Sequence, residues 1–177
     1  PNFKVRCTGK TELYGQTFHC WKEKGHGLVN LKNAMKQSCD TYFYEIARLL
    51  GVDRLKITAK KFGLGEKVLG KYFENEKQGL FPNTSWKKNN LGKGWVLGET
   101  LITGIGQGYT QTTPLQLCLM TAQIANGGYS IKPKIIVNNN PLSFEEAKKN
   151  MKEQSLINFS TQLFKDEKNI KIVQEAM

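Results

Sequence analysis

The feature that most constrains this chain is a polar break between two stretches that have the apolar periodicity of a helix. Apolar residues recur every three or four positions on both sides: Leu31, Ala34 and Met35 before it, and Tyr42, Phe43, Ile46, Ala47 and Leu50 after it. This spacing predicts two helices, the second ended by Gly51. The break carries a hydroxyl, a thiol and a carboxylate in succession, at Ser38, Cys39 and Asp40. Such a triplet either faces a cleft or a ligand, or simply caps the second helix.

Composition places the chain among single-domain globular proteins. Its 177 residues are enough for one core, and 39% of them are hydrophobic. The formal net charge is +11, but the lysines are scattered without a basic run, so we expect a solvated basic surface and no nucleic-acid partner. No apolar run approaches the ~20 residues of a membrane span. The chain begins at Pro1 without Met and ends in a helix-like run without a stop signal, so we expect an internal fragment of a longer protein.

The first half of the chain divides into three segments. Residues 1–30 are interrupted by glycines and predict a loop-rich start, and Asn30 is a suitable cap for the helix that follows. Residues 31–65 predict the helices around the polar break and one more short helix. Residues 66–99 are polar and irregular, with Pro82 and several glycines, and we expect a surface excursion there.

The second half predicts one core helix and a polar end. Residues 100–128 read as a glycine-rich loop and then a broadly apolar helix that starts at Thr113-Pro114, buries the Cys118 thiol and stops at Asn126-Gly127-Gly128. In residues 129–177 we expect these features in order: a short strand pair up to Val137, a turn, a charged helix from Ser143, a polar insertion at 154–169 and a truncated final helix.

The polar break resembles the second active-site motif of the penicillin-binding transpeptidases, which is usually Ser-x-Asn, with Asp40 in the third place. Further stretches follow in the order found in the penicillin-binding protein 2 family, the class B transpeptidases of bacterial cell elongation: Gly25-His26-Gly27, Gly51-Val52-Asp53-Arg54-Leu55, Phe62-Gly63-Leu64-Gly65, Gly98-Glu99-Thr100, Gly104-Ile105-Gly106-Gln107-Gly108-Tyr109 and Thr113-Pro114-Leu115-Gln116. The resemblance implies the α/β fold shared with serine β-lactamases, a sheet between helical layers. Much of that sheet would come from outside this chain, so we expect 1–177 to be a partial transpeptidase domain, mainly α with a few short strands.

The resemblance also implies a reaction. The intact enzyme would be a serine D,D-transpeptidase that cross-links peptidoglycan stem peptides and is acylated by β-lactams. Ser38 would relay protons between the nucleophile's lysine and the leaving group, and Asp40 would hold the cleft and contact a substrate amide. Because a carboxylate cannot donate a hydrogen bond, we expect Asp40 to pair with a lysine or a backbone amide.

Of the three motifs needed for this chemistry, only the second is found in its family position. Lys-Thr-Gly does not occur in the chain. A Ser-x-x-Lys sequence occurs from Ser85 to Lys88. We do not assign it as the nucleophile, because its flanks at Pro82-Asn83 and Asn89-Asn90 disfavour a helix and because it follows Ser38, against the family order. We therefore expect the fragment by itself to be inactive.

Three cysteines and a histidine suggest a metal site. Cys7, Cys20 and His26 lie in the glycine-broken start, and Cys39 lies within the polar break. A Cys3His set suits tetrahedral Zn2+, and four protein ligands would make the ion structural. Such an ion would pin a segment with few apolar side chains to the Ser38 motif. Two alternatives stay open: a Cys7–Cys20 disulfide, since the family works in the oxidising periplasm, or free thiols with His26 capping the turn at Gly27.

The family also implies partners and a location. The intact enzyme would lie at the periplasmic face of the bacterial inner membrane, held by an anchor outside this chain. It would work with a lipid-linked glycan polymerase and a shape-determining scaffold protein. A different hypothesis is a non-catalytic, zinc-stapled domain that binds a peptide or a partner protein. A related β-lactam sensor or hydrolase is a third, which the block at 104–109 fits less well.

Overall fold

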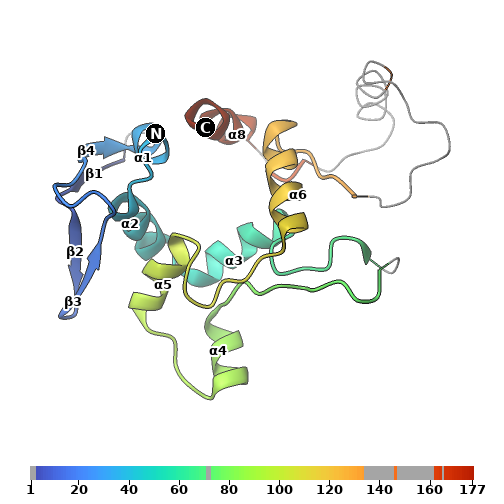
Figure 1. Cartoon of the computed structure of the whole chain (residues 1–177), viewed down its shortest axis with the longest axis horizontal. Coiled ribbons are helices and arrows are strands. Elements are labelled where there is room, and N and C mark those ends of the chain that lie inside the picture. The colour runs from blue at the N-terminus through green and yellow to red at the C-terminus, as the bar shows by residue number, and fades with distance from the viewer. Residues whose placement is uncertain (1–2, 71–72, 134–145, 147–161, 165) are drawn as a thin grey trace.

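The computed structural model describes residues 3–70, 73–133, 146, 162–164 and 166–177. The described part is mainly helical with a few short strands, as predicted (Figure 1). The strands and α1 and α2 lie on one side, α6 lies on the other, and α3 and α5 lie between them. Among the described residues, no helix combines the length and apolarity that a membrane crossing requires.

The N-terminal segment differs from the loop-rich start predicted for 1–30, because its glycines join short strands. Strand β1 (Lys4–Cys7) pairs antiparallel with β4 (Gly27–Asn30), with Cys7 opposite Gly27. Strand β2 (Lys10–Leu13) pairs with β3 (Gln16–His19) as a hairpin. Gly25 is needed where two backbones meet, since a Cβ there would lie 2.2 Å from the Cys7 carbonyl oxygen.

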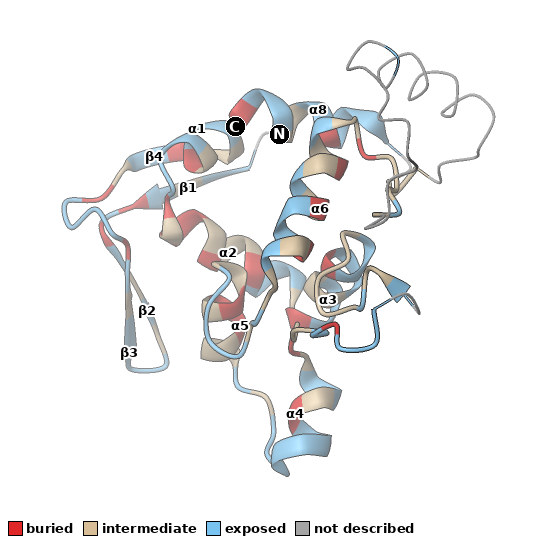
Figure 2. Ribbon diagram, turned by 45° about the vertical axis from the view of Figure 1, so that its right-hand side comes forward, coloured by how far each residue is buried: buried red, intermediate tan, exposed pale blue. Residues whose placement is uncertain are grey.

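The two helices predicted around the polar break are present. Helix α1 (Leu31–Lys36) begins at Asn30, whose side chain accepts from the Asn33 amide as predicted. Helix α2 (Asp40–Leu50) follows the break and packs against β1 and α5 (Leu97–Gly104). Gly104 lets α5 approach closely, because a Cβ there would lie 2.4 Å from the Ala47 Cβ. Several residues of α2 are buried, and they appear as the red segments of this helix in Figure 2.

The surface excursion predicted for 66–99 is partly wrong. After helix α3 (Val52–Lys61), the chain forms a further helix, α4 (Thr84–Leu91), and α5 already begins at Leu97. Asn83 caps α4, since its side chain accepts from the Trp86 amide. Buried Lys87 then pairs with Glu99, which also accepts from the Val96 amide at the start of α5. One ion pair therefore joins α4 to α5.

Helix α6 (Pro114–Ala125) has the predicted start and stop, but its burial differs. The Cys118 thiol is exposed, so the prediction that it is buried is wrong. The buried side of α6 carries Gln116, Leu119 and Gln123, at a spacing that turns Cys118 outward. The Gln116 amide donates to the carbonyls of Glu66 and Gln78 and its oxygen accepts from the Thr113 amide.

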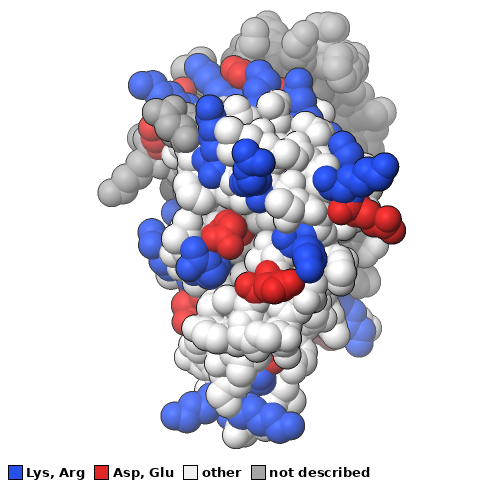
Figure 3. Space-filling view, turned by 90° about the vertical axis from the view of Figure 1, so that its left-hand side faces the viewer, with Lys and Arg blue, Asp and Glu red and all other residues white. Residues whose placement is uncertain are grey.

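The C-terminal part of the described chain is helix α8 (Glu167–Ala176), which packs against α1 and α6. The predicted strand pair is represented by a single bridge between Tyr129 and Gln162, and its residues after 133 lie outside the described part. The predicted helix from Ser143 and most of the insertion at 154–169 also lie outside it. Figure 3 shows basic and acidic side chains interspersed over the strand-bearing face, with no single basic stripe.

Candidate active-site motif and metal-binding cluster

Ser38 lies at the end of α1 in a backbone conformation that is unusual for a serine. Its φ of 49° is in the left-handed region. The Ser38 amide donates to the Met35 carbonyl and the Cys39 amide donates to the Ala34 carbonyl, at 3.1 and 2.9 Å. This pair of bonds is the Schellman motif, which ends a helix and normally carries glycine where Ser38 stands. The geometry leaves the Ser38 side chain exposed.

Asp40 is the first residue of α2 and is half-buried. Its Oδ2 accepts from the Trp21 backbone amide at 2.9 Å, which confirms the predicted pairing with an amide. A carboxylate in the first turn also interacts favourably with the helix dipole. Ser38 and Asp40 share a pocket of about 360 Å³ whose other lining residues are Met35, Phe43, Gly104 and Ile105. The two predicted catalytic residues therefore lie side by side at one pocket.

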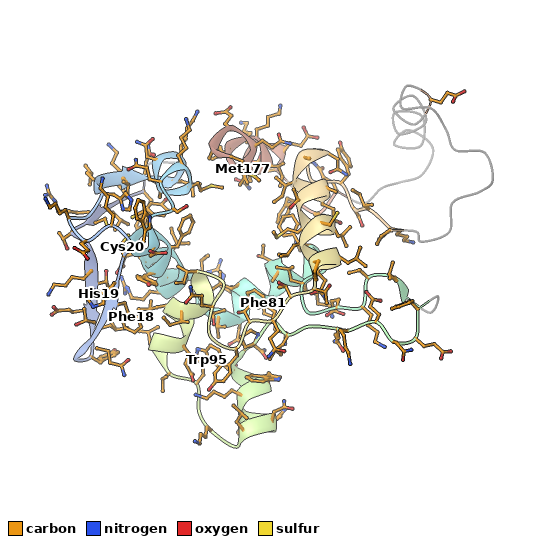
Figure 4. All side chains as sticks on the ribbon, in the orientation of Figure 1. Phe18, His19, Cys20, Phe81, Trp95 and Met177 are labelled. Carbon is orange, nitrogen blue, oxygen red and sulfur yellow. The ribbon has the colours of Figure 1, made fainter. Side chains whose placement is uncertain are left out.

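The four predicted metal ligands are brought together by different elements. Cys7 ends β1, Cys20 directly follows β3, His26 precedes β4, and Cys39 is the residue before α2. Their ligand atoms all lie within 4.8 Å of one another. The Nδ1 atom of His26 is 3.6 Å from the Cys7 sulfur and 3.5 Å from the Cys20 sulfur. All three thiols are buried and none forms a disulfide in the structure (Cys20 is labelled in Figure 4).

The electrostatics of these thiols are uneven. Burial opposes ionisation of Cys7, but its hydrogen bonds with Thr41, His26 and the Gly9 backbone outweigh burial and lower the pKa of Cys7 to about 6. Burial, together with the neighbouring Cys7 and Cys20, raises the pKa of Cys39 to about 12. Thiolates this close repel one another, so ionising all three requires a cation between them. Three sulfurs and one imidazole nitrogen are the donor set and number that suit tetrahedral Zn2+.

The Ser-x-x-Lys sequence from Ser85 to Lys88, which we did not assign as the nucleophile, forms a helix that was not predicted. Ser85 lies in the first turn of α4, so the argument that its flanks disfavour a helix is wrong. Asn83, taken as a breaker, is the cap of that helix. Ser85 and Lys88 are both exposed, and α4 projects away from α2 (Figure 1). Neither residue lines the pocket that holds Ser38.

One residue of the site was missed by sequence reasoning. Trp21 follows Cys20 directly and contacts the polar break at two points, through its backbone amide and its indole. A tryptophan next to a candidate ligand was the available signal, but nothing in its spacing linked it to Ser38.

Comparisons with known proteins agree with this geometry. The model of the penicillin binding protein transpeptidase domain matches residues 1–173. The peptidoglycan D,D-transpeptidase MrdA of Acinetobacter baumannii is 42% identical over 119 residues, which are 67% of this chain and 18% of that protein. The chain therefore belongs to the penicillin-binding protein transpeptidase family, and it spans about a fifth of the length of the curated relatives it matches.

Solved structures narrow the similarity within the family. Pseudomonas aeruginosa PBP2 in complex with WCK 5153 matches with a TM-score of 0.81 and 36% identity, over 99% of this chain and 38% of that one. PBP2 of Helicobacter pylori in complex with MreC matches with a TM-score of 0.78 and 30% identity, over 99% and 30% of the two chains. A peptidoglycan synthase complex that coordinates polymerization and crosslinking matches with a TM-score of 0.69 and 28% identity, over 99% and 28%. The resemblance to the penicillin-binding protein 2 family is thereby confirmed.

Proposed function

We propose that the full-length protein containing this chain is a serine D,D-transpeptidase that cross-links peptidoglycan stem peptides. The observation that carries the proposal is the placement of Ser38: an exposed serine in a strained backbone conformation, which lines a pocket together with Asp40. Strained conformations persist where the surrounding structure holds them, and they gather at functional sites. The names of the family members that this chain resembles support the same reaction.

In this proposal Ser38 and Asp40 have separate roles. The Ser38 hydroxyl can both donate and accept, so it can pass a proton between the base of the nucleophile and the leaving group. Asp40 already accepts from the Trp21 amide through Oδ2, which leaves Oδ1 to accept from a substrate amide. The nucleophile and the third motif would come from parts of the protein outside this chain.

We further propose that Cys7, Cys20, His26 and Cys39 hold a structural Zn2+. When bound, the ion would supply fixed ligation and charge compensation for the thiolates, and no open position for a substrate. Cys39 lies between Ser38 and Asp40, so its ligation would fix the backbone of the motif. The chain's own contribution is a largely buried donor set placed at or beside the ends of three strands and just before α2.

Partners and location follow from the relatives. The complete protein would bind a MreC-type scaffold, as Helicobacter pylori PBP2 does, and a glycan polymerase, as in the similar peptidoglycan synthase complex, and it would be acylated by β-lactams. We place it at the periplasmic face of the bacterial inner membrane, where its substrate would be assembled.

The test is acylation of the full-length protein by a fluorescent β-lactam, followed on a gel, with metal content measured on the same sample. We expect one label per protein, abolished by prior treatment with penicillin, and about one zinc per chain. Labelling of the isolated 177-residue chain would contradict the assignment of the nucleophile to another segment. A full-length protein that takes no label would favour a non-catalytic binding domain.

A further inference from the structure

Trp21 connects the cysteine–histidine cluster to the Ser38 motif. Its backbone amide donates to Asp40 Oδ2 at 2.9 Å, and its indole Nε1 donates to the Gln37 carbonyl at 3.0 Å. Its ring also packs edge-on against the His26 ring, with centroids 5.3 Å apart. Trp21, which directly follows the candidate ligand Cys20, thus contacts the candidate ligand His26. It also contacts residues on both sides of Ser38.

The two hydrogen bonds reach the positions that set the direction of the Ser38 hydroxyl. Gln37 is the last residue before Ser38, at the end of α1, and its carbonyl is one of those that a helix end leaves without an intrahelical partner. Helix α1 has only 6 residues, so it depends on such tertiary contacts to stay formed. Asp40 fixes the other side of Ser38, at the start of α2.

Burial does not account for Trp21. Its side chain is 64% exposed, so it contributes little to the core compared with the buried aromatic residues of α2. Its contacts are instead directed: an amide, an indole N–H and one ring edge, each with a different part of the site.

We propose that Trp21 is a positioning residue that transmits the geometry of the cysteine–histidine cluster to Ser38 and Asp40. This inference rests on the proposed transpeptidase function. It deepens that function by assigning contacts through which the cluster affects the reaction. Cys39 is part of the motif and is buried, whereas Trp21 reaches the motif from the exposed segment after β3.

The test uses the full-length protein with its bound metal and the variant Trp21→Phe, which keeps the backbone amide and the ring but removes the indole N–H. Stopped-flow acylation by a β-lactam separates the dissociation constant of the first complex from the rate constant of acylation. We expect the rate constant to fall about tenfold, as for the loss of one hydrogen bond, with the dissociation constant and the metal content unchanged.

The matched control is Trp95→Phe. The Trp95 indole also donates one hydrogen bond, to Thr100 Oγ1 at 2.8 Å, but at the start of α5 and away from the cluster. We expect its acylation rate constant to stay within about twofold of the wild type, because this hydrogen bond contacts neither the cluster nor the residues beside Ser38. An unchanged rate constant in Trp21→Phe would overturn the proposal, as would a loss of bound metal in that variant.

A second measurement separates this proposal from the proposed function. Hydrogen exchange of the backbone amides at 37–40 should be faster in Trp21→Phe than in the wild type and unchanged in Trp95→Phe. If the wild type is not acylated at all, the transpeptidase assignment fails, and the exchange data alone decide whether Trp21 holds the Ser38 segment. Equal exchange in wild type and Trp21→Phe would overturn the positioning role.

Discussion

Helix α1 ends with the same hydrogen bonds as α3, α5 and α6 but with a different residue at the turn. In each case two successive amides donate back to carbonyls of the last helical turn. The residue in the left-handed conformation is Gly63 after α3, Gly106 after α5 and Gly127 after α6, whereas it is Ser38 after α1. Three ends use the residue that the geometry favours, and the fourth has a serine in a conformation that is strained for a residue with a Cβ. The difference singles out the α1 end and supports the role proposed for Ser38.

The two halves of the molecule also differ in how they are held together. Around α1 and α2, three buried thiols and one histidine meet in a cluster, and Trp21 donates hydrogen bonds to Asp40 and to the Gln37 carbonyl beside it. Around α6, two fully or nearly fully buried glutamines join the helix to the chain beside it through backbone groups. Under the zinc proposal the first arrangement would depend on a bound ion, whereas the hydrogen bonds of the second are formed within the chain itself. Substitutions in the two halves test this contrast.

The largest effect should come from the cluster. Cys39→Ala in the full-length protein removes a ligand and should lower the free energy of unfolding by about 4 kcal/mol or more, because a lost metal site is among the most damaging single changes. Thermal unfolding with metal analysis measures it. Cys118→Ala is the control, since that thiol is exposed, and it should change stability by less than about 0.5 kcal/mol. Equal effects of the two variants on the free energy of unfolding would mean that the cluster does not stabilise the fold.

Removing the Ser38 hydroxyl should affect the reaction more than the fold. Ser38→Ala should lower the acylation rate constant by about 100-fold or more, as expected for a side chain that moves a proton in the transition state. Ser85→Ala is the matched control, because Ser85 is also an exposed serine at a helix end but lies on α4. Normal acylation in Ser38→Ala, or a loss in Ser85→Ala, would reverse the assignment of the two serines.

On the α6 side the sharpest substitution is Gln116→Leu. It removes the donor to two carbonyls and the acceptor for the Thr113 amide, so we expect a loss of about 2 kcal/mol in unfolding free energy. Chemical denaturation measures it, with Gln111→Leu as the control, since the Gln111 side chain is exposed and only its backbone pairs with Leu80. A loss of similar size in the control would show that the buried amide is not the cause.

The sequence predicted which candidate residues lie together better than it predicted the fold around them. The helices flanking Ser38 follow from apolar spacing, and the Cys3His set follows from residue type, because both signals are local. The short strands of the N-terminal segment were missed, since their pairing depends on contacts between distant residues such as Cys7 and Gly27. Helix α4 was missed because Asn83 reads equally as a breaker or as a cap. Cys118 was placed inside because α6 is apolar on several sides, and only its packing decides which side is buried.

The glycine ends give a direct test of the strain argument. Gly63→Ala should lower the unfolding free energy by about 1–2 kcal/mol, because a residue with a Cβ is penalised in the left-handed region. The new Cβ would also lie 2.9 Å from a methyl carbon of Leu119. Gly94→Ala is the control: it has an ordinary φ and no atom near its Cβ position, and it should be neutral or slightly stabilising. Equal stability of the two variants would remove the basis for calling the α1 end strained.

The smallest effect is also the most specific. Ser38→Gly should raise the unfolding free energy by about 0.5 kcal/mol, since relief of the left-handed strain outweighs the greater freedom of glycine in the unfolded chain. Its acylation rate should nevertheless fall as far as that of Ser38→Ala. Gln37→Gly, one residue earlier and at a φ of −102°, should instead lose stability, because there is no strain to relieve. A more stable but inactive Ser38→Gly variant would mean that the serine is kept for its hydroxyl against the preference of the turn. A less stable one would mean that the serine contributes to the fold, and the contrast with the glycine ends would then lose its functional meaning.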